Sequence, residues 1–273
     1  MNRKSVSFSV LSGKGGVGKS NLALNICYGL HLLGRKVLLM DCDMGLANMD
    51  VLLGVTPEKD MQDILINNRN PSEILIPFGP GGQSGLDLLP ANSGMAEFVD
   101  LDTGARSILR EKLNPLAATY DFVCMDIGAG ISPTVLSFAA MSVLRLVVIT
   151  PEPTSLTDSY ALMKVLSARY DVSDFQIIVN LTDSRDEAKR TYNRLSAVCK
   201  RFLGFVPAFL CEIRTDRSLV DAVRKQRPLM ELSPRSPAAL DCMAAAEKLD
   251  RLRDALPGTG DNNPPLRAVR VLE

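Results

Sequence analysis

Residues 13–20, close to the N-terminus, restrict the possible folds more than any other part of this sequence. They read Gly-Lys-Gly-Gly-Val-Gly-Lys-Ser and fit the pattern G-x4-G-K-[ST]. An apolar stretch, residues 6–11, precedes them, and an amphipathic stretch, residues 20–33, follows. A phosphate-binding loop needs this strand–loop–helix context, because glycines let backbone N–H groups turn toward anionic oxygens at the start of a helix. The motif therefore predicts a nucleotide phosphate site after the first strand.

The side chains of this loop have separate expected roles. Lys19 is expected to neutralise the β- and γ-phosphates, and the Ser20 hydroxyl is expected to bind Mg²⁺. The residues expected to hold the nucleotide here are Gly13, Lys14, Gly15, Gly16, Val17, Gly18, Lys19, Ser20 and Asn21. A glycine-rich turn without a ligand is the alternative, and the residues that flank the motif disfavour it.

Carboxylates follow two other apolar stretches. Asp126 comes directly after residues 122–125, and Asp41 and Asp43 follow the stretch that begins at residue 36. Because the carboxyl ends of parallel strands share one edge of a sheet, these side chains are expected near the phosphate loop. Asp126 is a candidate ligand for Mg²⁺ or its bound water. An acidic residue at position 41 or 43 can orient the attacking water or reach the metal. A solvated loop is the alternative for Asp41 and Asp43.

Short apolar runs alternate with longer amphipathic stretches along most of the chain. The expected strands are residues 6–11, 36–41, 86–90, 122–127, 144–150, 175–180 and 208–210. The expected helices are residues 20–33, 106–118, 133–142, 154–170, 186–202, 218–224 and 236–256. Alternation at about 30-residue spacing indicates right-handed βαβ units. We therefore expect a doubly wound α/β fold with a mostly parallel sheet and helices on both faces.

The 273 residues are expected to form one domain, residues 1–256, followed by a flexible tail, residues 257–273. The tail starts with a Pro- and Gly-rich linker and ends in a short amphipathic segment, residues 266–272, for which contact with a membrane is an alternative to disorder. Six cysteines without a CxxC pair, and no visible signal peptide, indicate a cytoplasmic protein.

Charge and histidine content exclude several classes of function. A formal net charge of zero argues against a chain that coats nucleic acid by bulk attraction. The only histidine, His31, excludes a metal site built from several histidines within one chain. Residues 185–227, however, hold 11 Lys/Arg against 5 Asp/Glu, a local charge of +6. Solvated helix faces are one interpretation of this segment, and a docking surface for acidic lipid, a protein or DNA is the other.

A second lysine in the loop, Lys14, makes the motif resemble that of the deviant Walker A ATPases related to MinD and ParA. The similarity continues through residues 41–54, 126–132, 150–162, 222–228 and 234–238, and these stretches look most like the FlhG (FleN) group of flagellar regulators. The resemblance implies a slow ATPase that uses ATP and Mg²⁺ and forms a homodimer with ATP between its subunits. It further implies control of flagellar number and placement. The partners implied are an FlhF-type GTPase, a flagellar transcriptional activator or components of the C-ring.

The resemblance also assigns residue roles. Lys14 would reach the phosphates of the partner subunit's ATP, Asp43 would position the attacking water, and Asn48 would follow in the same switch. Gly128 would join Asp126 in a second switch, and Asn180 would bind adenine. The expected catalytic residues are Lys14, Lys19 and Asp43, and the expected metal ligands are Ser20, Asp43 and Asp126. Residues 211–216 lack the proline usual in the family, so main-chain contacts to adenine around Arg214 are not expected.

Two other functions remain open from the sequence. One is a ParA-like ATPase for DNA partition, which the basic segment would favour. The other is a nucleotide-dependent metabolic enzyme.

Overall fold

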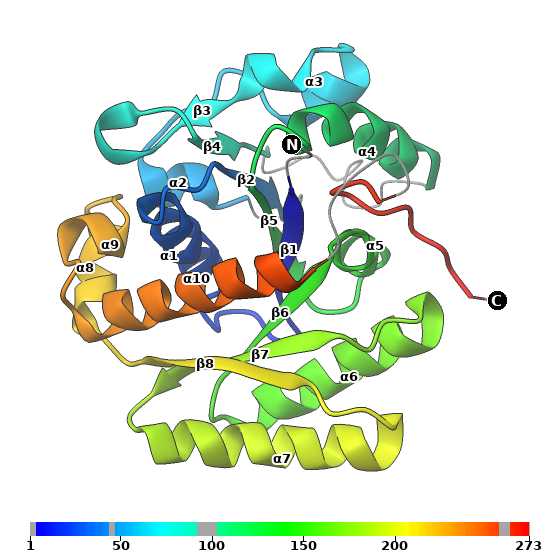
Figure 1. Cartoon of the computed structure of the whole chain (residues 1–273), viewed down its shortest axis with the longest axis vertical. Helices are drawn as coiled ribbons and strands as arrows, with labels where there is room; N and C mark the ends of the chain where they lie inside the picture. The colour runs from blue at the N-terminus through cyan, green and yellow to red at the C-terminus, as the bar shows by residue number, and fades with distance from the viewer. Residues whose placement is uncertain (1–3, 44–46, 92–102, 257–262, 273) are drawn as a thin grey trace.

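A central sheet of eight strands in the order β3-β4-β2-β5-β1-β6-β7-β8 organises the chain (Figure 1). The structure is a computed structural model, and it describes residues 4–43, 47–91, 103–256 and 263–272. Neighbouring strands are parallel except β3 and β4, which are antiparallel. The strands are β1 (Val6–Ser12), β2 (Val37–Cys42), β3 (Ile76–Pro77), β4 (Leu86–Leu89), β5 (Phe122–Ala129), β6 (Leu144–Ile149), β7 (Phe175–Thr182) and β8 (Ala208–Arg214).

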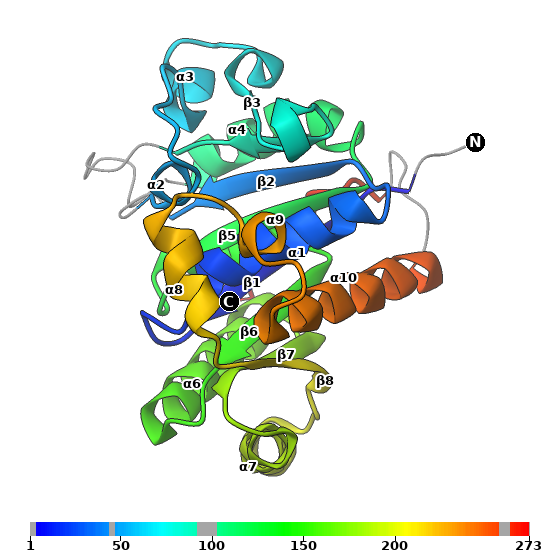
Figure 2. The same ribbon diagram turned by 90° about the vertical axis from the view of Figure 1, so that its left-hand side faces the viewer.

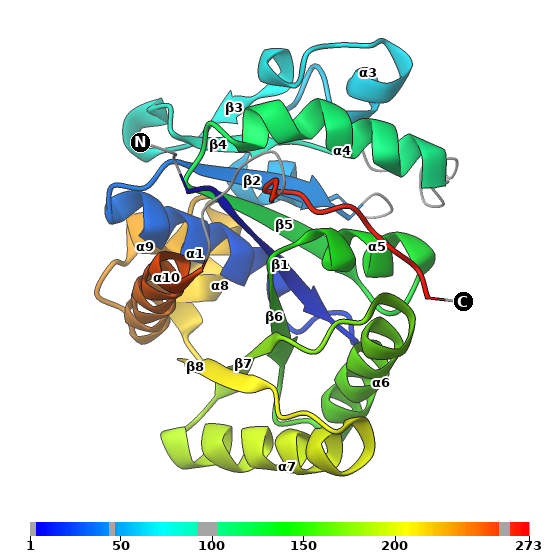
Figure 3. The ribbon, with the colours of Figure 1, turned by 45° about the vertical axis from the view of Figure 1, so that its right-hand side comes forward.

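Helices cover both faces of the sheet, which confirms the expected doubly wound α/β class. Helices α1 and α10 lie on one face with α8 and α9, whereas α4, α5, α6 and α7 lie on the other (Figures 2 and 3). The helices are α1 (Lys19–Leu32), α2 (Met49–Leu53), α3 (Met61–Ile66), α4 (Thr103–Ala117), α5 (Pro133–Met141), α6 (Pro153–Tyr170), α7 (Arg185–Leu203), α8 (Arg217–Arg224), α9 (Leu229–Leu232) and α10 (Pro237–Ala255). Two short 3₁₀ helices, η1 (Pro71–Ile74) and η2 (Pro80–Gly82), lie beside β3.

Strand β1 alternates apolar residues and serines although both of its faces are buried. Val6, Phe8 and Val10 belong to the core on the α1 and α10 side. Ser7 and Ser9 lie on the other side, where Ser9 Oγ is 2.8 Å from Ser142 Oγ and Ser7 Oγ donates to the carbonyl of Pro265. Small polar residues on this face therefore allow the end of α5 and the C-terminal segment to approach the sheet closely.

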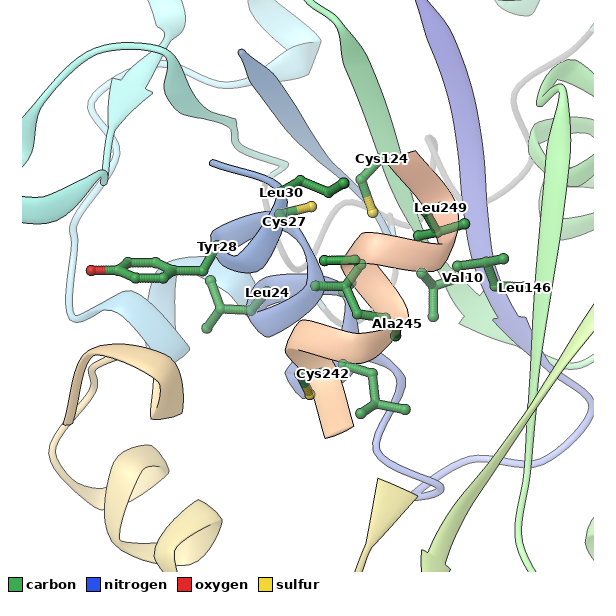
Figure 4. Close-up of a cluster of buried hydrophobic side chains, with 14 of the residues drawn as sticks. Val10, Leu24, Cys27, Tyr28, Leu30, Cys124, Leu146, Cys242, Ala245 and Leu249 are labelled. Atoms are coloured by element: carbon green, nitrogen blue, oxygen red, sulfur yellow. The ribbon is translucent and has the colours of Figure 1, made fainter. Parts of the chain in front are cut away.

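The helix that follows the phosphate loop packs tightly against the last long helix. Figure 4 shows buried side chains of α1 and α10 in one hydrophobic cluster with residues of the sheet, among them Leu24, Ala245 and Leu249. A Cβ atom placed on Gly29 of α1 would lie 2.9 Å from the Cβ of Ala246 in α10. Small residues at this crossing bring the two helices together, and this contact fixes α1 on the sheet.

The short elements between β2 and β4 were not expected from the sequence. Helices α2 and α3 have five and six residues, and β3 has two. Their apolar positions are too few to define a period. Each expected strand and helix is present, and the largest difference in length is at β8, which continues to Arg214 instead of ending at residue 210.

The described part of the C-terminal segment differs from the expected flexible tail. Residues 263–272 form no helix and run in extended form along α4, α5 and α6. Leu266 is 1% exposed, and its backbone exchanges two hydrogen bonds with the Asn114 side chain, at 2.9 and 3.1 Å. The amide of Leu272 donates to the carbonyl of Arg169 at 2.8 Å. The burial of Leu266 and these hydrogen bonds explain why residues 263–272 are held against the helices. The composition of the linker did not indicate such contacts. No helix in the described part of the chain has the length and apolar character needed to cross a membrane.

Candidate nucleotide-binding site

Three adjacent strands deliver the predicted site residues to one edge of the sheet. Strand β5 lies between β1 and β2, so the carboxyl ends of all three strands meet. In the register of these strands, Asp126 is paired with Val10 of β1 and with Asp41 of β2. The phosphate loop after β1 and the carboxylates after β2 and β5 therefore share this edge, as the sequence predicted.

The phosphate loop joins β1 to α1 through a backbone that depends on glycine. Gly18 is the N-cap of α1 at φ 92° and has no side chain to cap the helix. The first amides of α1 are therefore left for a ligand, and the helix dipole favours an anion there. A Cβ on Gly13 would lie 2.1 Å from the backbone of Asp158 in α6, so Gly13 serves the packing of the loop against that helix.

A cavity of about 740 Å³ opens in front of the loop. Its volume lies within the range of sites for small molecules and cofactors. It is lined by Gly15, Gly16, Gly18, Lys19, Ser20, Asn21, Cys42, Asp43, Asn48, Val51, Leu52, Gly128, Ala129, Ser132, Thr134, Val135 and Val223. Most of the predicted nucleotide-binding residues are among these, and Gly13, Lys14, Val17 and Asn180 lie outside the lining.

Lys19 and Ser20 line the cavity, and Asp126, which is 2% exposed and lies outside the lining, accepts a hydrogen bond from Ser20. Burial lowers the pKa of Lys19, and the charges of Asp126 and Asp43 partly oppose this effect. Burial raises the pKa of Asp126 to about 7 and the Asp41 carboxylate adds to the shift, whereas a hydrogen bond from Ser20 and the charge of Lys19 oppose it. Asp126 Oδ1 is buried and accepts no hydrogen bond from the residues that the structure describes. A hydroxyl beside an unpartnered carboxylate oxygen fits a hard cation such as Mg²⁺, which prefers oxygen ligands.

Asp41 and Asp43 have different environments although they are two residues apart. Asp41 is 1% exposed and accepts hydrogen bonds from the amides of Asp43, Asn48 and Met49 at 3.1–3.2 Å. Burial raises the pKa of Asp41 to about 6, and these amides oppose the shift. Asp43 lines the cavity and lies against Gly128, where an added Cβ would be 3.1 Å from Asp43 Oδ1. Asp41 therefore shapes the turn after β2, and Asp43 is the carboxylate that faces a ligand.

Lys14 points away from the cavity of its own chain. Its Nζ pairs with the Glu152 carboxylate and donates to Thr154 Oγ1 at 3.1 Å, at the start of α6. The Lys14 side chain keeps 36% of its surface exposed. It is therefore accessible to another molecule at the loop.

Asn180 supports the phosphate loop from beneath. It is 1% exposed, and its Nδ2 donates to the carbonyl of Val17 at 2.7 Å. The same atom would lie 2.5 Å from a Cβ on Gly18. In this structure the amide contacts the loop, and its role toward adenine remains a prediction. Arg214, at the end of β8, is bound by the Asp241 carboxylate at 2.8 and 2.9 Å.

Two parts of the cavity wall were not predicted from the sequence, namely its apolar side and the first turn of α5. Val51 and Leu52 come from α2 and Val223 comes from α8, and the side chain of Gln226 holds these helices together by donating to the Val51 carbonyl at 2.8 Å. The one usable signal was Gly54, whose left-handed conformation ends α2.

Comparisons with known proteins agree with this geometry. Residues 6–176 match the family described as an AAA domain. Antiactivator FleN of Pseudomonas aeruginosa is 37% identical over 242 residues, which are 89% of this chain and 85% of FleN. Flagellum site-determining protein YlxH of Helicobacter pylori is 34% identical over 232 residues, which are 83% of this chain and 75% of YlxH.

Among solved structures, the MinC:MinD cell division protein complex of Aquifex aeolicus contains a similar chain. It superimposes with a TM-score of 0.75 at 26% identity and covers 93% of this chain and 99% of its own.

Proposed function

This chain belongs to the AAA-domain ATPases of the MinD type that include FleN, and from that membership we propose that it regulates flagellar number and placement as an ATP-driven switch. The observation that carries the proposal is the placement of the buried Asp126 carboxylate beside Lys19 and Ser20 of the phosphate loop, in a chain 37% identical to FleN. Hydrolysis of ATP to ADP and phosphate is the activity of the family, and this chain has the residues that it needs.

The site supports in-line attack of water on the γ-phosphate. The amides of the loop and the start of α1 would bind the phosphates, and Lys19 would balance their charge. The Ser20 hydroxyl and the Asp126 carboxylate would hold Mg²⁺, which neutralises charge on the β- and γ-phosphate oxygens. Asp43, which lines the cavity beside Gly128, would orient the attacking water.

Two features support a homodimer with the nucleotide between its subunits. Lys14 leaves its own cavity and stays partly exposed, in a position from which it can reach a second copy. Apolar side chains of the cavity lining are also open to solvent, since Val51 and Val223 are 59% and 38% exposed. A second copy of the chain would remove this surface from water.

The proposed partners are those of flagellar regulators, namely an FlhF-type GTPase, a flagellar transcriptional activator or C-ring components. Partition of DNA and metabolic catalysis are not favoured, because the similar proteins FleN and YlxH are named as an antiactivator and a flagellum site-determining protein. Contact with the inner face of a membrane remains a proposal for the C-terminal segment.

Deletion of the gene in its own organism tests this function. We expect the number or placement of flagella per cell to change, and we expect the wild-type gene to restore it. A gene carrying Asp43→Ala should fail to restore the phenotype while the purified variant still binds ATP. Flagella unchanged in number and placement after deletion would contradict the proposed function.

A further inference from the structure

Helix α5 connects the nucleotide cavity to the opposite end of the sheet. Its first turn supplies Ser132, Thr134 and Val135 to the cavity wall. The residues from Thr134 to Met141 are all buried, and most of them are apolar. Such a helix has no exposed polar face to fix its rotation or its position along its axis, because apolar contacts are not directional. Directional contacts come from polar groups, namely those at its two ends and Arg106 of α4, which donates to Ser137 Oγ and to the Pro133 carbonyl.

The C-terminal end of α5 is bound by one arginine from β6. The last carbonyls of a helix have no partner within the helix, and a buried helix end must satisfy them elsewhere. Arg145 does this: its Nε donates to the Ala139 carbonyl at 2.9 Å, and its Nη2 donates to the carbonyls of Ala140 and Ser142 at 3.2 and 2.7 Å. Arg145 is 2% exposed, and its remaining charge partner is Asp174, at 2.8 Å.

Two further contacts hold the same end. Ser142 Oγ donates to the Ala139 carbonyl at 2.8 Å and lies 2.8 Å from Ser9 Oγ of β1. The amide of Arg267, in the C-terminal segment, donates to the Met141 carbonyl at 2.9 Å. Arg145 nevertheless supplies three of the bonds from a single planar group, and its five fixed donors suit this fork better than the point charge of a lysine.

We propose that Arg145 is a positioning residue for ATP hydrolysis, which fixes α5 from its far end and thereby sets the cavity wall at Ser132 and Val135 against the phosphate loop. A helix of nine residues is about 13 Å long and moves as a unit, so a shift or rotation at its C-terminus is carried to its first turn. The inference rests on the proposed ATPase activity. It adds a residue outside the cavity that acts on turnover.

The test is Arg145→Lys, compared with Arg253→Lys as a matched control. Arg253 of α10 is also a buried arginine, 8% exposed, and it donates to Asp121 Oδ1 and to the Lys4 carbonyl, both at 2.9 Å. Both substitutions replace a buried planar guanidinium group by an ammonium group and should lower the melting temperature. At a temperature well below both melting points, we expect kcat of Arg145→Lys to fall about tenfold or more, with the Kd for a fluorescent ADP analogue changed less than about threefold. Arg253→Lys should keep kcat within about twofold.

Hydrogen exchange locates the effect. Amides of residues 132–142 should lose protection in Arg145→Lys but not in Arg253→Lys. Equal kcat in the two variants, or unchanged protection of α5, would show that Arg145 has only a structural role. If Arg145→Lys does not fold, Ser142→Ala removes one bond at the same helix end, and an unchanged kcat in that variant would overturn the proposal. Wild-type protein without ATPase activity would instead contradict the proposed function.

Discussion

Gly18 occupies a position where no residue with a side chain fits. Its φ of 92° lies in the left-handed region, and an added Cβ would lie 2.5 Å from Asn180 Nδ2. Gly18→Ala therefore forces the loop or Asn180 to move, and the amides of α1 lose their orientation toward phosphate. We expect nucleotide affinity to fall at least about tenfold, which corresponds to about 1.4 kcal/mol. Titration calorimetry with ADP measures this change.

Gly34 provides the control for Gly18. Its φ is 81°, but nothing lies within 4 Å of an added Cβ. Gly34→Ala should therefore lose about 1 kcal/mol of folding stability from backbone strain and leave nucleotide affinity unchanged. Equal affinities for Gly18→Ala and wild type would show that the close approach of Asn180 does not shape the site.

Asp126 is predicted to be required for ATP hydrolysis. It is also predicted to lower the stability of the folded protein when no nucleotide is bound. Asp126→Asn removes a buried carboxylate whose Oδ1 has no hydrogen-bond partner within residues 4–43, 47–91, 103–256 and 263–272. We expect ATP hydrolysis to be lost, because the metal site loses its charged ligand. In the same variant, we expect the melting temperature of the nucleotide-free protein at pH 8 to rise by several degrees. Calorimetric scans of both proteins without nucleotide test the second effect.

The pH dependence of this gain follows from the pKa of Asp126, which rises from 3.8 to about 7 in the folded chain. Between these values the folded state holds the Asp126 proton more tightly than the unfolded state. The contribution of Asp126 to the stability of the wild-type protein therefore decreases as pH increases from about 4 to 7. Asn has no such titration. The advantage of Asp126→Asn should therefore be largest above pH 7 and shrink as pH falls toward 4. An advantage that does not vary with pH would contradict this assignment.

At the level of single residues, the sequence predicted groups that act through a local motif. The loop from Gly13 to Ser20 and the carboxylates Asp43 and Asp126 lie at one edge, because strand order alone brings them there. Spacing alone did not separate Asp41 from Asp43, and the resemblance gave the site role to Asp43; the structural difference lies in the amides of Asp43, Asn48 and Met49, which bind Asp41 only in the folded chain. The contacts of Arg145 could not be predicted from the sequence either, since its partners are backbone carbonyls at the end of α5.

Among the helices, the contact between α1 and α10 is the one on which the phosphate loop depends. Gly29→Ala should gain up to about 1 kcal/mol from helix propensity. The new Cβ would, however, lie 2.9 Å from the Cβ of Ala246, so overpacking should give a net loss of about 1–2 kcal/mol. Urea unfolding of the variant measures the sum of the two effects.

A compensating substitution separates steric overlap from other causes. Ala246→Gly removes the facing methyl group and should by itself be destabilising by about 1 kcal/mol. In Gly29→Ala with Ala246→Gly, the methyl moves from one helix to the other, and stability should return close to that of the wild type. Additive losses in the double variant would show that the two Cβ positions do not compete.

The long elements were predictable, and the short ones were not. A helix such as α7 has 19 residues and a clear polar face, whereas α2 and β3 depend on tertiary contacts such as the bond from Gln226 to the Val51 carbonyl. The C-terminal segment shows the same limit. Its sequence has the composition of a linker, yet Leu266 completes a core between α4 and β1 that only the folded sheet creates.

For the whole molecule, the zero net charge conceals an uneven distribution. In the described part of the chain, Lys189, Arg190, Arg194, Lys200 and Arg201 of α7 form no ion pair. This helix lies at the end of the molecule opposite α3 and β3 (Figure 1). Its unpaired charge is therefore concentrated at one end of the sheet.

Dimerisation driven by ATP should depend on Lys14 although nucleotide binding should not. Lys14 lies outside the lining of its own cavity, so Lys14→Ala should change the Kd for ADP less than about threefold. The variant should nevertheless stay monomeric with ATP, since no other loop cation is placed to reach the partner subunit's phosphates. Light scattering coupled to size exclusion measures this, with Asp43→Ala in both proteins to slow hydrolysis.

Glu152→Gln tests whether the same monomer–dimer equilibrium can be shifted toward the dimer. In a single chain Lys14 is paired with Glu152, and the dimer requires that pair to break. The two side chains are 36% and 60% exposed, and surface ion pairs contribute at most about 1 kcal/mol. Because two such pairs break in each dimer, Glu152→Gln should strengthen ATP-dependent dimerisation up to about thirtyfold and leave the protein monomeric with ADP. Weaker dimerisation in this variant would mean that Glu152 belongs to the dimer contact instead of competing with it.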